Sequence, residues 1–476
     1  MVGIVPVLAE QLADAYMNDR FCEYMEDKIR RAQRDCDRFS RDEAKQAVAR
    51  YYLASFQRTF DDYKSLFFRN IINSFKWLQE EGIIDVLTSA ATHGFLPLLE
   101  HDSAVYSQIH VGVKSYEKYF GCKPRGFWLP ECAYRPREWS KRENRERRGI
   151  DEWLADEGIR FFFVENIGIE RAALLDNKNH ELAPTTYRGY KLESGVCVFG
   201  RNQATGKQVW SPDGGYPGDP YYREFHSKDS ESGLQYWRVT QQVPKETYLP
   251  AKAMERVQVH ADHFVQLLRE KAAEASGTVR ECSPVIASPY DCELYGHWWH
   301  EGPAWIEAVY RRLLKDSQVQ CLALDEYIEK YGDTFSTIKM QPSTWGLNGD
   351  FTVWQNPEHS WLWPYINGST VDFENVLRTS KETTGSSNPR ESRIQSQMAR
   401  ELLLMEGSDW PFLLFTKQAK EYANQRFHNH HQRFNKLLWA AKNPSDLKRI
   451  NAKDLKEMED IDNPWPEIEI DAFRHR

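Results

Sequence analysis

The sequence predicts an α/β protein whose parallel sheet is rolled toward a barrel. Between residues 83 and 340, short apolar segments of β type alternate with amphipathic segments of helical length. Strands joined by helices pair in parallel, because the helix returns the chain to the same end of the sheet. The number of these units favours a barrel. At 476 residues and 55.9 kDa, the chain is long enough for two or three modules.

The first part of the chain is predicted to combine one barrel segment with a block of helices. Residues 1–18 open with the β-type run "VGIV" and continue into helical sequence, so we expect them to begin the barrel. From 19 to 82, apolar residues recur three and four positions apart in a highly charged background. This spacing predicts a helical insertion, and Gly82 is the predicted stop of its last helix.

The barrel itself is assigned to residues 83–340. Four segments read as strands: "IIDVLTSAA", "RGFWLPE", "IRFFFVE" and "SPVIASPYD". Four others read as helices: "AVYSQIHVGVKSYEKYF", "RGIDEWLADEG", "KAMERVQVHADHFVQLLREKAAEA" and "GPAWIEAVYRRLLKD". Residues 166–250 are rich in Gly, Pro and Tyr and too long for an ordinary connection, which predicts a functional loop excursion. Residues 341–476 are mainly helical and are expected to form a C-terminal domain packed against the barrel.

Composition and charge narrow the class of protein. The net charge is −8, and the basic run at 141–148 is interleaved with acids, which predicts a solvated helix face or loop rather than a nucleic-acid surface. No window is apolar enough to span a bilayer, and no export signal follows Met1. Eight cysteines occur singly, which is typical of reduced thiols. We therefore expect a cytoplasmic protein that binds neither nucleic acid nor a membrane.

Two of the predicted strands end in a single carboxylate. "GFWLPE" ends in Glu131, and "VIASPYD" ends in Asp291. In parallel α/β barrels, catalytic groups lie where strands end, and a pair of carboxylates is what cleavage of a glycosidic bond requires. Taken singly, each acid could instead cap a helix or pair with an arginine. Aromatic neighbours such as Trp128 and Trp298 favour catalysis, because an apolar wall raises the pKa of one acid and keeps it protonated.

Metal and phosphate sites are not indicated by the sequence. His260 and His263 are three positions apart, as are His297 and His300, and "HNHH" spans 428–431. None of these has a recognised ligand spacing, and we expect "HNHH" to lie on the surface of a charged helix. No phosphate-binding loop occurs between a strand and a helix. We expect no metal and no cofactor.

The two acidic motifs and six further segments resemble glycoside hydrolase family 57, and are most similar to its 1,4-α-glucan branching enzymes. The two motifs are "GFWLPECAY" and "ASPYDCELYGHWW". The further segments are "ATHGFLPLL", "RRGIDEWLADEGIRFFFVE", "VFGRN", "QVWSPDGGYPGDPYYREFH", "STWGLNGDFTVW" and "RELLLMEGSDWPFLLFTKQ". Together they extend over almost the whole chain. The resemblance implies an incomplete (β/α)7 barrel with a helical insertion and a C-terminal α-helical domain that contributes to the glucan site.

The resemblance also implies roles for individual residues. Glu131 matches the family's nucleophile, and Asp291 matches its general acid/base. An α-1,4-glucan would be cleaved through a β-glucosyl-enzyme and transferred to a 6-hydroxyl, which gives a branch with net retention. His93 matches a pocket histidine that donates a hydrogen bond to a sugar hydroxyl. The remaining glucan-binding residues that the resemblance implies are Arg201, Gly218, Trp345, Asp409 and Gln418. Trp128 and Trp298 are expected to bind glucan as well, because of their places in the sequence beside the two acids.

Two departures from the family pattern leave alternatives open. The family begins with a strand that carries an H-x-P motif, whereas this chain opens at a segment similar to the sequence after it, so we expect that strand and its histidine to be missing. The loop before "VFGRN" is short, and Tyr187 or Tyr190 could take the place of a tyrosine that favours transfer. An α-amylase or 4-α-glucanotransferase would use the same two acids, and a catalytically impaired glucan-binding relative is a third possibility.

Overall fold

A six-stranded sheet lies at the centre of the computed structural model, in the order β1-β2-β3-β6-β9-β8. The first five strands pair in parallel, which confirms the predicted parallel sheet, and β8 is antiparallel to β9. Their bounds are Val2–Gly3 for β1, Val86–Ser89 for β2, Gly126–Trp128 for β3, Phe161–Val164 for β6, Tyr190–Lys191 for β8 and Cys197–Gly200 for β9.

The structure describes residues 1–140, 144–176, 183–211, 214–240, 243–277, 279, 282–383, 389–443 and 450–474. In this part of the chain, no helix combines the length and the apolar character that crossing a bilayer requires.

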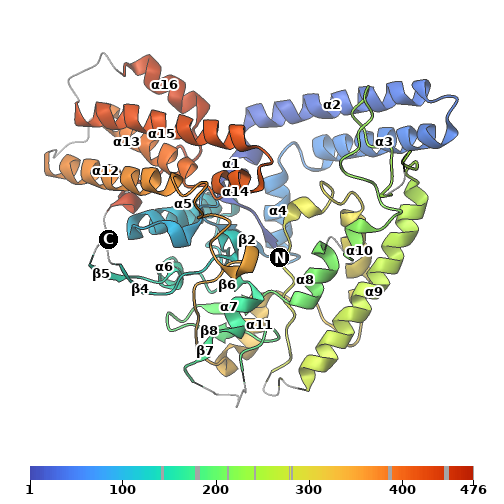
Figure 1. The fold of residues 1–476 in the computed structure, drawn as a ribbon, viewed down its shortest axis with the longest axis horizontal. Helices are drawn as coiled ribbons and strands as arrows, with labels where there is room; N and C mark the ends of the chain where they lie inside the picture. Colours follow the sequence, from blue (N-terminus) through green and yellow to red (C-terminus); the bar gives the residue numbers. More distant parts are fainter. Residues whose placement is uncertain are drawn as a thin grey trace.

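Helices follow the strands, as the alternating pattern predicts (Figure 1). They are α5 (Asp102–Phe120) after β2, α6 (Ile150–Asp156) before β6, α7 (Asn166–Glu170) after β6 and α8 (Gln203–Trp210) after β9. Helix α5 lies so close to β2 that a Cβ atom on Gly112 would come within 2.1 Å of the carbonyl oxygen of Ser89. Only a glycine allows this approach.

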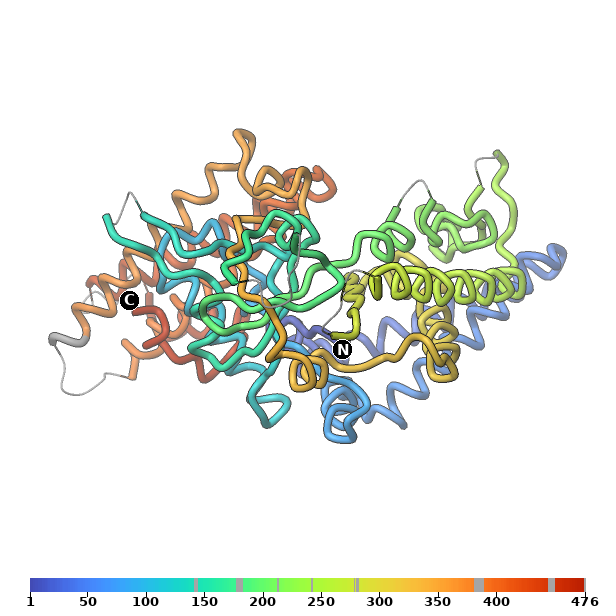
Figure 2. The backbone as a smooth tube through the Cα atoms, turned by 90° about the horizontal axis from the view of Figure 1, so that it is seen from below, coloured from blue at the N-terminus to red at the C-terminus, as the bar shows by residue number. Residues whose placement is uncertain are grey.

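The helical insertion forms an arm together with two later helices. Residues 19–82 contain most of α2 (Ala15–Arg38) together with α3 (Glu43–Asp61) and α4 (Ile71–Glu80), and Gly82 follows α4 with φ of 68°. Helix α1 (Pro6–Ala13) precedes them, in the segment predicted to begin the barrel. Figures 1 and 2 show α2 and α3 beside α9 (Pro250–Ser276) and α10 (Gly302–Leu313), away from the C-terminal helices. A hydrophobic cluster joins these parts through buried rings such as those of Tyr52, Tyr236 and Trp305.

Two parts of the predicted barrel differ from expectation. Residues 166–250 are not only a loop excursion: they contain α7, α8, β8, β9 and a short strand β7 (Ala173–Leu174), which pairs with β10 (Ile338–Lys339). The prediction of a strand at 283–291 is wrong, because this segment forms no strand pairing. It is held instead by two backbone hydrogen bonds, from Val285 N to Tyr187 O at 2.9 Å and from Asn202 N to Ala287 O at 2.8 Å.

The C-terminal region is helical and shares a core with the barrel. After α11 (Leu324–Tyr331) it contains α12 (Leu362–Thr383), α13 (Pro389–Met405), α14 (Asp409–Thr416), α15 (Lys420–Lys442) and α16 (Ala452–Ile461). One hydrophobic cluster includes Phe127 of β3 together with Met398 and Leu402 of α13. The predicted C-terminal helices are therefore confirmed as elements packed on the sheet.

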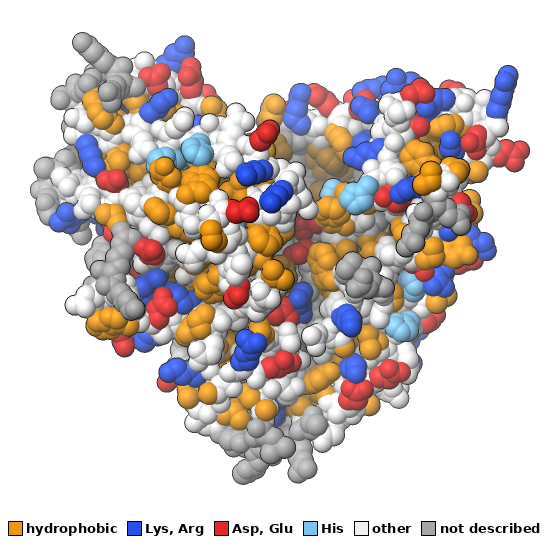
Figure 3. All heavy atoms as spheres, in the orientation of Figure 1, with side chains coloured by type: hydrophobic (Ala, Val, Ile, Leu, Met, Phe, Trp, Pro, Cys, Tyr) orange, Lys and Arg blue, Asp and Glu red, His pale blue; other side chains and the backbone are white. Residues whose placement is uncertain are grey.

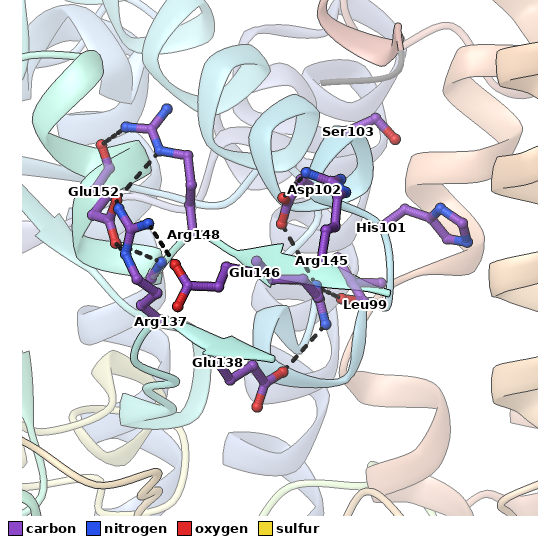
Figure 4. Close-up of polar contacts among 12 residues, drawn as sticks. Leu99, His101, Asp102, Ser103, Arg137, Glu138, Arg145, Glu146, Arg148 and Glu152 are labelled. Carbon is purple, nitrogen blue, oxygen red and sulfur yellow. Dashed lines mark hydrogen bonds and ion pairs between the residues drawn. The ribbon is translucent and has the colours of Figure 1, made fainter. Parts of the chain in front are cut away.

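The basic run at 141–148 is not simply a solvated face. Its described residues belong to an antiparallel hairpin of β4 (Glu138–Ser140) and β5 (Arg145–Arg147). Arg147 is buried and lies 3.5 Å from Asp102, which is also buried at the start of α5, while Arg145 lies 3.3 Å from the same carboxylate (Figure 4). Arg147 also donates to the carbonyl of Leu99. The hairpin is thus fastened to α5 by buried charge.

Candidate active site

Glu131 follows β3 directly and has an unusual backbone. Its φ is 60°, in the left-handed region that side chains other than glycine rarely adopt. Its carbonyl oxygen accepts from Thr344 Oγ1 at 2.8 Å and from Trp345 N at 3.1 Å. A neighbouring bridge between Tyr134 and Ser343 holds the same two segments together. The strand end is therefore clamped by the segment that leads into the C-terminal helices.

Both carboxylate oxygens of Glu131 are fixed by hydrogen bonds. Trp345 Nε1 donates to Oε2 at 2.7 Å, and Ser408 Oγ donates to Oε1 at 3.0 Å. The two donors come from beyond residue 341, whereas Glu131 comes from the sheet. Because two donors approach from different directions, the carboxylate is held in one orientation, as a nucleophile requires.

His93 lies close to both Ser408 and Glu131. Its Nδ1 is 3.0 Å from Ser408 Oγ and 3.8 Å from Glu131 Oε1. The backbone also connects the two, since Ser408 N donates to His93 O at 3.1 Å. His93 has φ of 55°, so a second residue of the site adopts the left-handed region. His93, Ser408 and Glu131 thus form one chain of contacts.

Asp291 is half-buried and ends the segment at 283–291. The pKa of its carboxyl group is raised to about 7, mainly because the group is buried and also because of the nearby charges of Glu293 and Glu131, while the guanidinium of Arg201 acts in the opposite direction. A carboxylic acid with this pKa holds a proton near neutral pH and can release it, which is what a general acid/base does.

Arg201 and two tryptophans line the site beside Glu131. Arg201 follows β9, pairs with Glu165 at the end of β6, and lies with its guanidinium 5.3 Å from the centre of the Trp345 ring. The ring of Trp128 meets that of Trp345 edge to face at 5.4 Å. Next to Arg201 is a cavity of about 290 Å³, lined by Glu165, Arg201, Gln203, Gly206, Lys207, Trp210 and Ser211.

The structure does not bring the other predicted glucan-binding residues into this cluster. Within the described part of the chain, no hydrogen bond, ion pair or ring contact joins Gly218, Asp409, Gln418 or Trp298 to Glu131. Asp409 is exposed at the start of α14, next to Ser408, and Gln418 is exposed after that helix. Gly218 ends a short 3-10 turn that follows α8.

The two tyrosines differ in their surroundings. Tyr190 is buried, and its hydroxyl accepts from Thr185 N at 2.8 Å. Tyr187 is half-buried, and its carbonyl accepts the bond from Val285. Part of the loop before them, residues 177–182, lies outside the described residues.

Sequence reasoning missed three residues of the site. Ser408 lies in the quoted "GSDWPF" segment, but a single serine carries no chemical signal. Trp210 lines the cavity and lies in the segment expected to be a loop. Glu165 could have been found, since it ends the segment "IRFFFVE" just as Glu131 ends "GFWLPE".

Cys132, next to Glu131, is a packing residue. It is completely buried, and burial raises the pKa of its thiol well above the ordinary value, so the thiolate that a nucleophile needs is disfavoured. This agrees with the expectation from sequence. The other cysteine beside an acid, Cys292, is exposed.

One cluster of possible metal ligands lies elsewhere, and it corrects the prediction for "HNHH". His430 is fully buried, not on the surface, and its Nδ1 is 2.7 Å from Glu401 Oε2. Asp462 completes the cluster, but Arg433 pairs with Asp462 and lies 3.6 Å from Glu401. Because a cation already neutralises the acids, these residues fit a buried ion-pair network better than a metal site.

Comparisons with known proteins extend over nearly the whole chain. A family model described as "Glycosyl hydrolase family 57" matches residues 5–341, and one described as "1,4-alpha-glucan branching enzyme, C-terminal" matches residues 373–473. A 1,4-alpha-glucan branching enzyme of Thermococcus kodakarensis is 41% identical over an alignment of 488 positions, gaps included, which covers 99% of this chain and 70% of that protein.

Two solved structures also resemble this chain over nearly its whole length. The crystal structure of a GH57 branching enzyme from Thermococcus kodakaraensis, in complex with glucose and additives, has a TM-score of 0.90 at 39% identity, with 99% of this chain and 86% of that chain covered. The alpha-amylase AmyC from Thermotoga maritima has a TM-score of 0.86 at 29% identity, with 100% of this chain and 89% of that chain covered.

Proposed function

The chain belongs to glycosyl hydrolase family 57, and from this membership we propose that it is a 1,4-α-glucan branching enzyme. The observation that carries the proposal is the pair of acids. The carboxylate of Glu131 is oriented by Trp345 and Ser408, while Asp291 has a pKa of about 7. The C-terminal match at residues 373–473 and the relative from Thermococcus favour branching over hydrolysis.

In the first half of the proposed reaction, Glu131 attacks C1 of a glucose unit in an α-1,4-glucan. The C1–O4 bond breaks, and the proton of Asp291 goes to the departing O4. The product is a β-glucosyl ester on Glu131. His93, Trp128, Trp345 and Arg201 line the position in which this glucose would lie.

In the second half, Asp291 acts as a base. It removes the proton from the 6-hydroxyl of an acceptor glucan, O6 bonds to C1, and the ester to Glu131 breaks. Two inversions at C1 give net retention and an α-1,6 branch. Gly218, Asp409 and Gln418 are proposed to contact outer parts of the glucan.

The proposal extends to domain organisation and location. We propose residues 1–18 and 83–340 as the catalytic barrel, 19–82 as its insertion, and 341–476 as a domain that completes the glucan site with Trp345 and Ser408. We also propose a cytoplasmic location, which is supported by eight cysteines that are all free thiols.

Incubation with amylose followed by debranching tests this function. If the protein is a branching enzyme, an α-1,6-specific debranching enzyme releases new short chains from the product. Glu131→Gln should give none, with an unchanged melting temperature. Reducing ends without debranchable chains would instead identify an α-amylase, and redistributed linear chains would identify a 4-α-glucanotransferase. If amylose is recovered unaltered, the protein is a catalytically impaired relative that can at most bind glucan.

A further inference from the structure

An exposed group of rings lies where the loop that follows Asp291 meets residues 225–226. Trp298 is 40% exposed, whereas its neighbour Trp299 is only 1% exposed. The Trp298 ring lies 4.4 Å from that of Phe225, and the rings of His226 and His297 lie 5.1 and 5.2 Å from Phe225. We call Phe225, His226, His297 and Trp298 the aromatic platform. Figure 3 shows histidine and hydrophobic side chains together on the right-hand side of the hollow in the middle of this face.

The part of the aromatic platform that carries Trp298 is connected to Asp291 by backbone hydrogen bonds. Trp298 N donates to Glu293 O at 3.1 Å, and Trp299 N donates to Leu294 O at 2.8 Å. Leu294 N in turn donates to Asp291 O at 3.2 Å. These bonds close the loop on itself, and the buried Trp299 anchors it. Trp298 is therefore held at a fixed place relative to the general acid/base.

The chemistry of the aromatic platform suits a sugar polymer. A flat ring packs against the apolar C–H face of a glucose unit, and the N–H groups of indole and imidazole can donate to its hydroxyls. A tryptophan kept exposed beside a half-buried phenylalanine also leaves apolar area in water that a ligand would cover. Both properties are those of a carbohydrate-binding surface.

We propose that the aromatic platform binds glucose units of the departing and acceptor glucan chains, as a site separate from the one around Glu131. Asp291 serves these chains, because it protonates O4 of the departing chain and deprotonates the 6-hydroxyl of the acceptor. Because Trp298 lies on the loop of Asp291, the aromatic platform is placed near the departing and acceptor chains that exchange protons with Asp291. This inference rests on the proposed function, since it takes an α-glucan as the ligand.

The test compares Trp298→Ala with Trp139→Ala in the full-length protein. Trp139 is also an exposed tryptophan (59%), but it lies on the β4–β5 hairpin. We expect Trp298→Ala to reduce retardation in gels that contain amylopectin, and to raise the KM for amylose about two- to tenfold, as loss of one aromatic contact predicts. The KM for a short maltooligosaccharide should rise less. Trp139→Ala should change none of these, and both variants should keep the melting temperature.

Three results would overturn the inference. If gel retardation and the KM for amylose are unchanged in Trp298→Ala, the aromatic platform does not bind glucan. Equal losses for long and short substrates would make Trp298 part of the site around Glu131. A change in oligomeric state with glucan binding intact would make the patch a contact between copies of this chain. The proposed function fails separately, because debranching of the wild-type product tests it without any change at Trp298.

Discussion

Ser408 is a single hydroxyl that connects two parts of the site. It is fully buried and lies 3.0 Å from both Glu131 Oε1 and His93 Nδ1. Ser408→Ala should lower kcat on amylose about ten- to hundredfold, because a hydrogen bond to a charged group contributes about 1.5–3 kcal/mol. KM should change little. Steady-state kinetics with Ser408→Thr as the conservative control measure this, and an unchanged kcat in the alanine variant would exclude a positioning role.

The pKa of Asp291 predicts how activity depends on pH. Asp291 must be protonated for the first step, so kcat/KM should fall as the pH rises through about 7. The charge of Glu293 raises this pKa. Removing that charge in Glu293→Gln should therefore lower the pKa and move the alkaline limb to lower pH. Exposed Glu80→Gln on α4 is the matched control. If the alkaline limb of Glu293→Gln stays at the wild-type pH, the limb does not report the protonation of Asp291.

At the residue scale, sequence alone points to the two acids that we propose as catalytic, but not to their hydrogen-bond partners. A carboxylate at the end of an apolar segment is a recognisable pattern, and it points to both Glu131 and Asp291, although only Glu131 follows a strand of the sheet. Ser408 and Trp345 lie more than 200 positions from Glu131, and only the fold brings them together. His430 shows the converse error: a polar run on a charged helix reads as surface, yet Glu401 supplies the partner that allows burial.

Among the elements, the packing of α5 on β2 depends on one glycine. In Gly112→Ala the new Cβ would clash with the backbone carbonyl of Ser89. A backbone atom inside a strand cannot move aside as the end of a side chain can. We expect a loss of about 1–3 kcal/mol or more and a lower melting temperature. Gly368→Ala is the matched control, because Gly368 also lies inside a helix, α12, with no atom within 4 Å of the added Cβ. It should be neutral or stabilise by about 1 kcal/mol. Equal melting temperatures for the two variants would contradict the close approach.

Elements with strong periodicity were predicted well, whereas short strands were not. The long helices α5 and α9 and the strands β2, β3 and β6 lie where their patterns place them. Strand β9 was hidden in "VCVFG", because four apolar residues within a Gly- and Pro-rich segment resemble a loop. The segment at 283–291 has a β-type composition, but its backbone bonds to Tyr187 and Asn202 do not form a regular ladder. Its pattern could not reveal this.

At the scale of the whole molecule, the sheet and the C-terminal helices share one core and one site. Leu129 and Phe127 belong to the same hydrophobic cluster as Met398 and Leu402. A chain cut after residue 341 should therefore be poorly soluble, because it exposes this core, and inactive, because it lacks Trp345 and Ser408. Soluble yield and the debranching assay measure both effects. A soluble fragment that still makes branches would show that the two regions are independent.

The left-handed backbone at His93 and Glu131 sets a limit on how the protein can be improved. Each such residue costs on the order of 1–3 kcal/mol, and the surrounding clamp holds it in place. Selection of a random library for heat resistance alone should therefore enrich glycine or asparagine at 93 and 131, since these residues relax the backbone. Such winners would be catalytically dead. Engineering for thermostability has to screen turnover in the same round, because two of the positions that glycine would relax lie in the proposed site, and one of them is the proposed nucleophile.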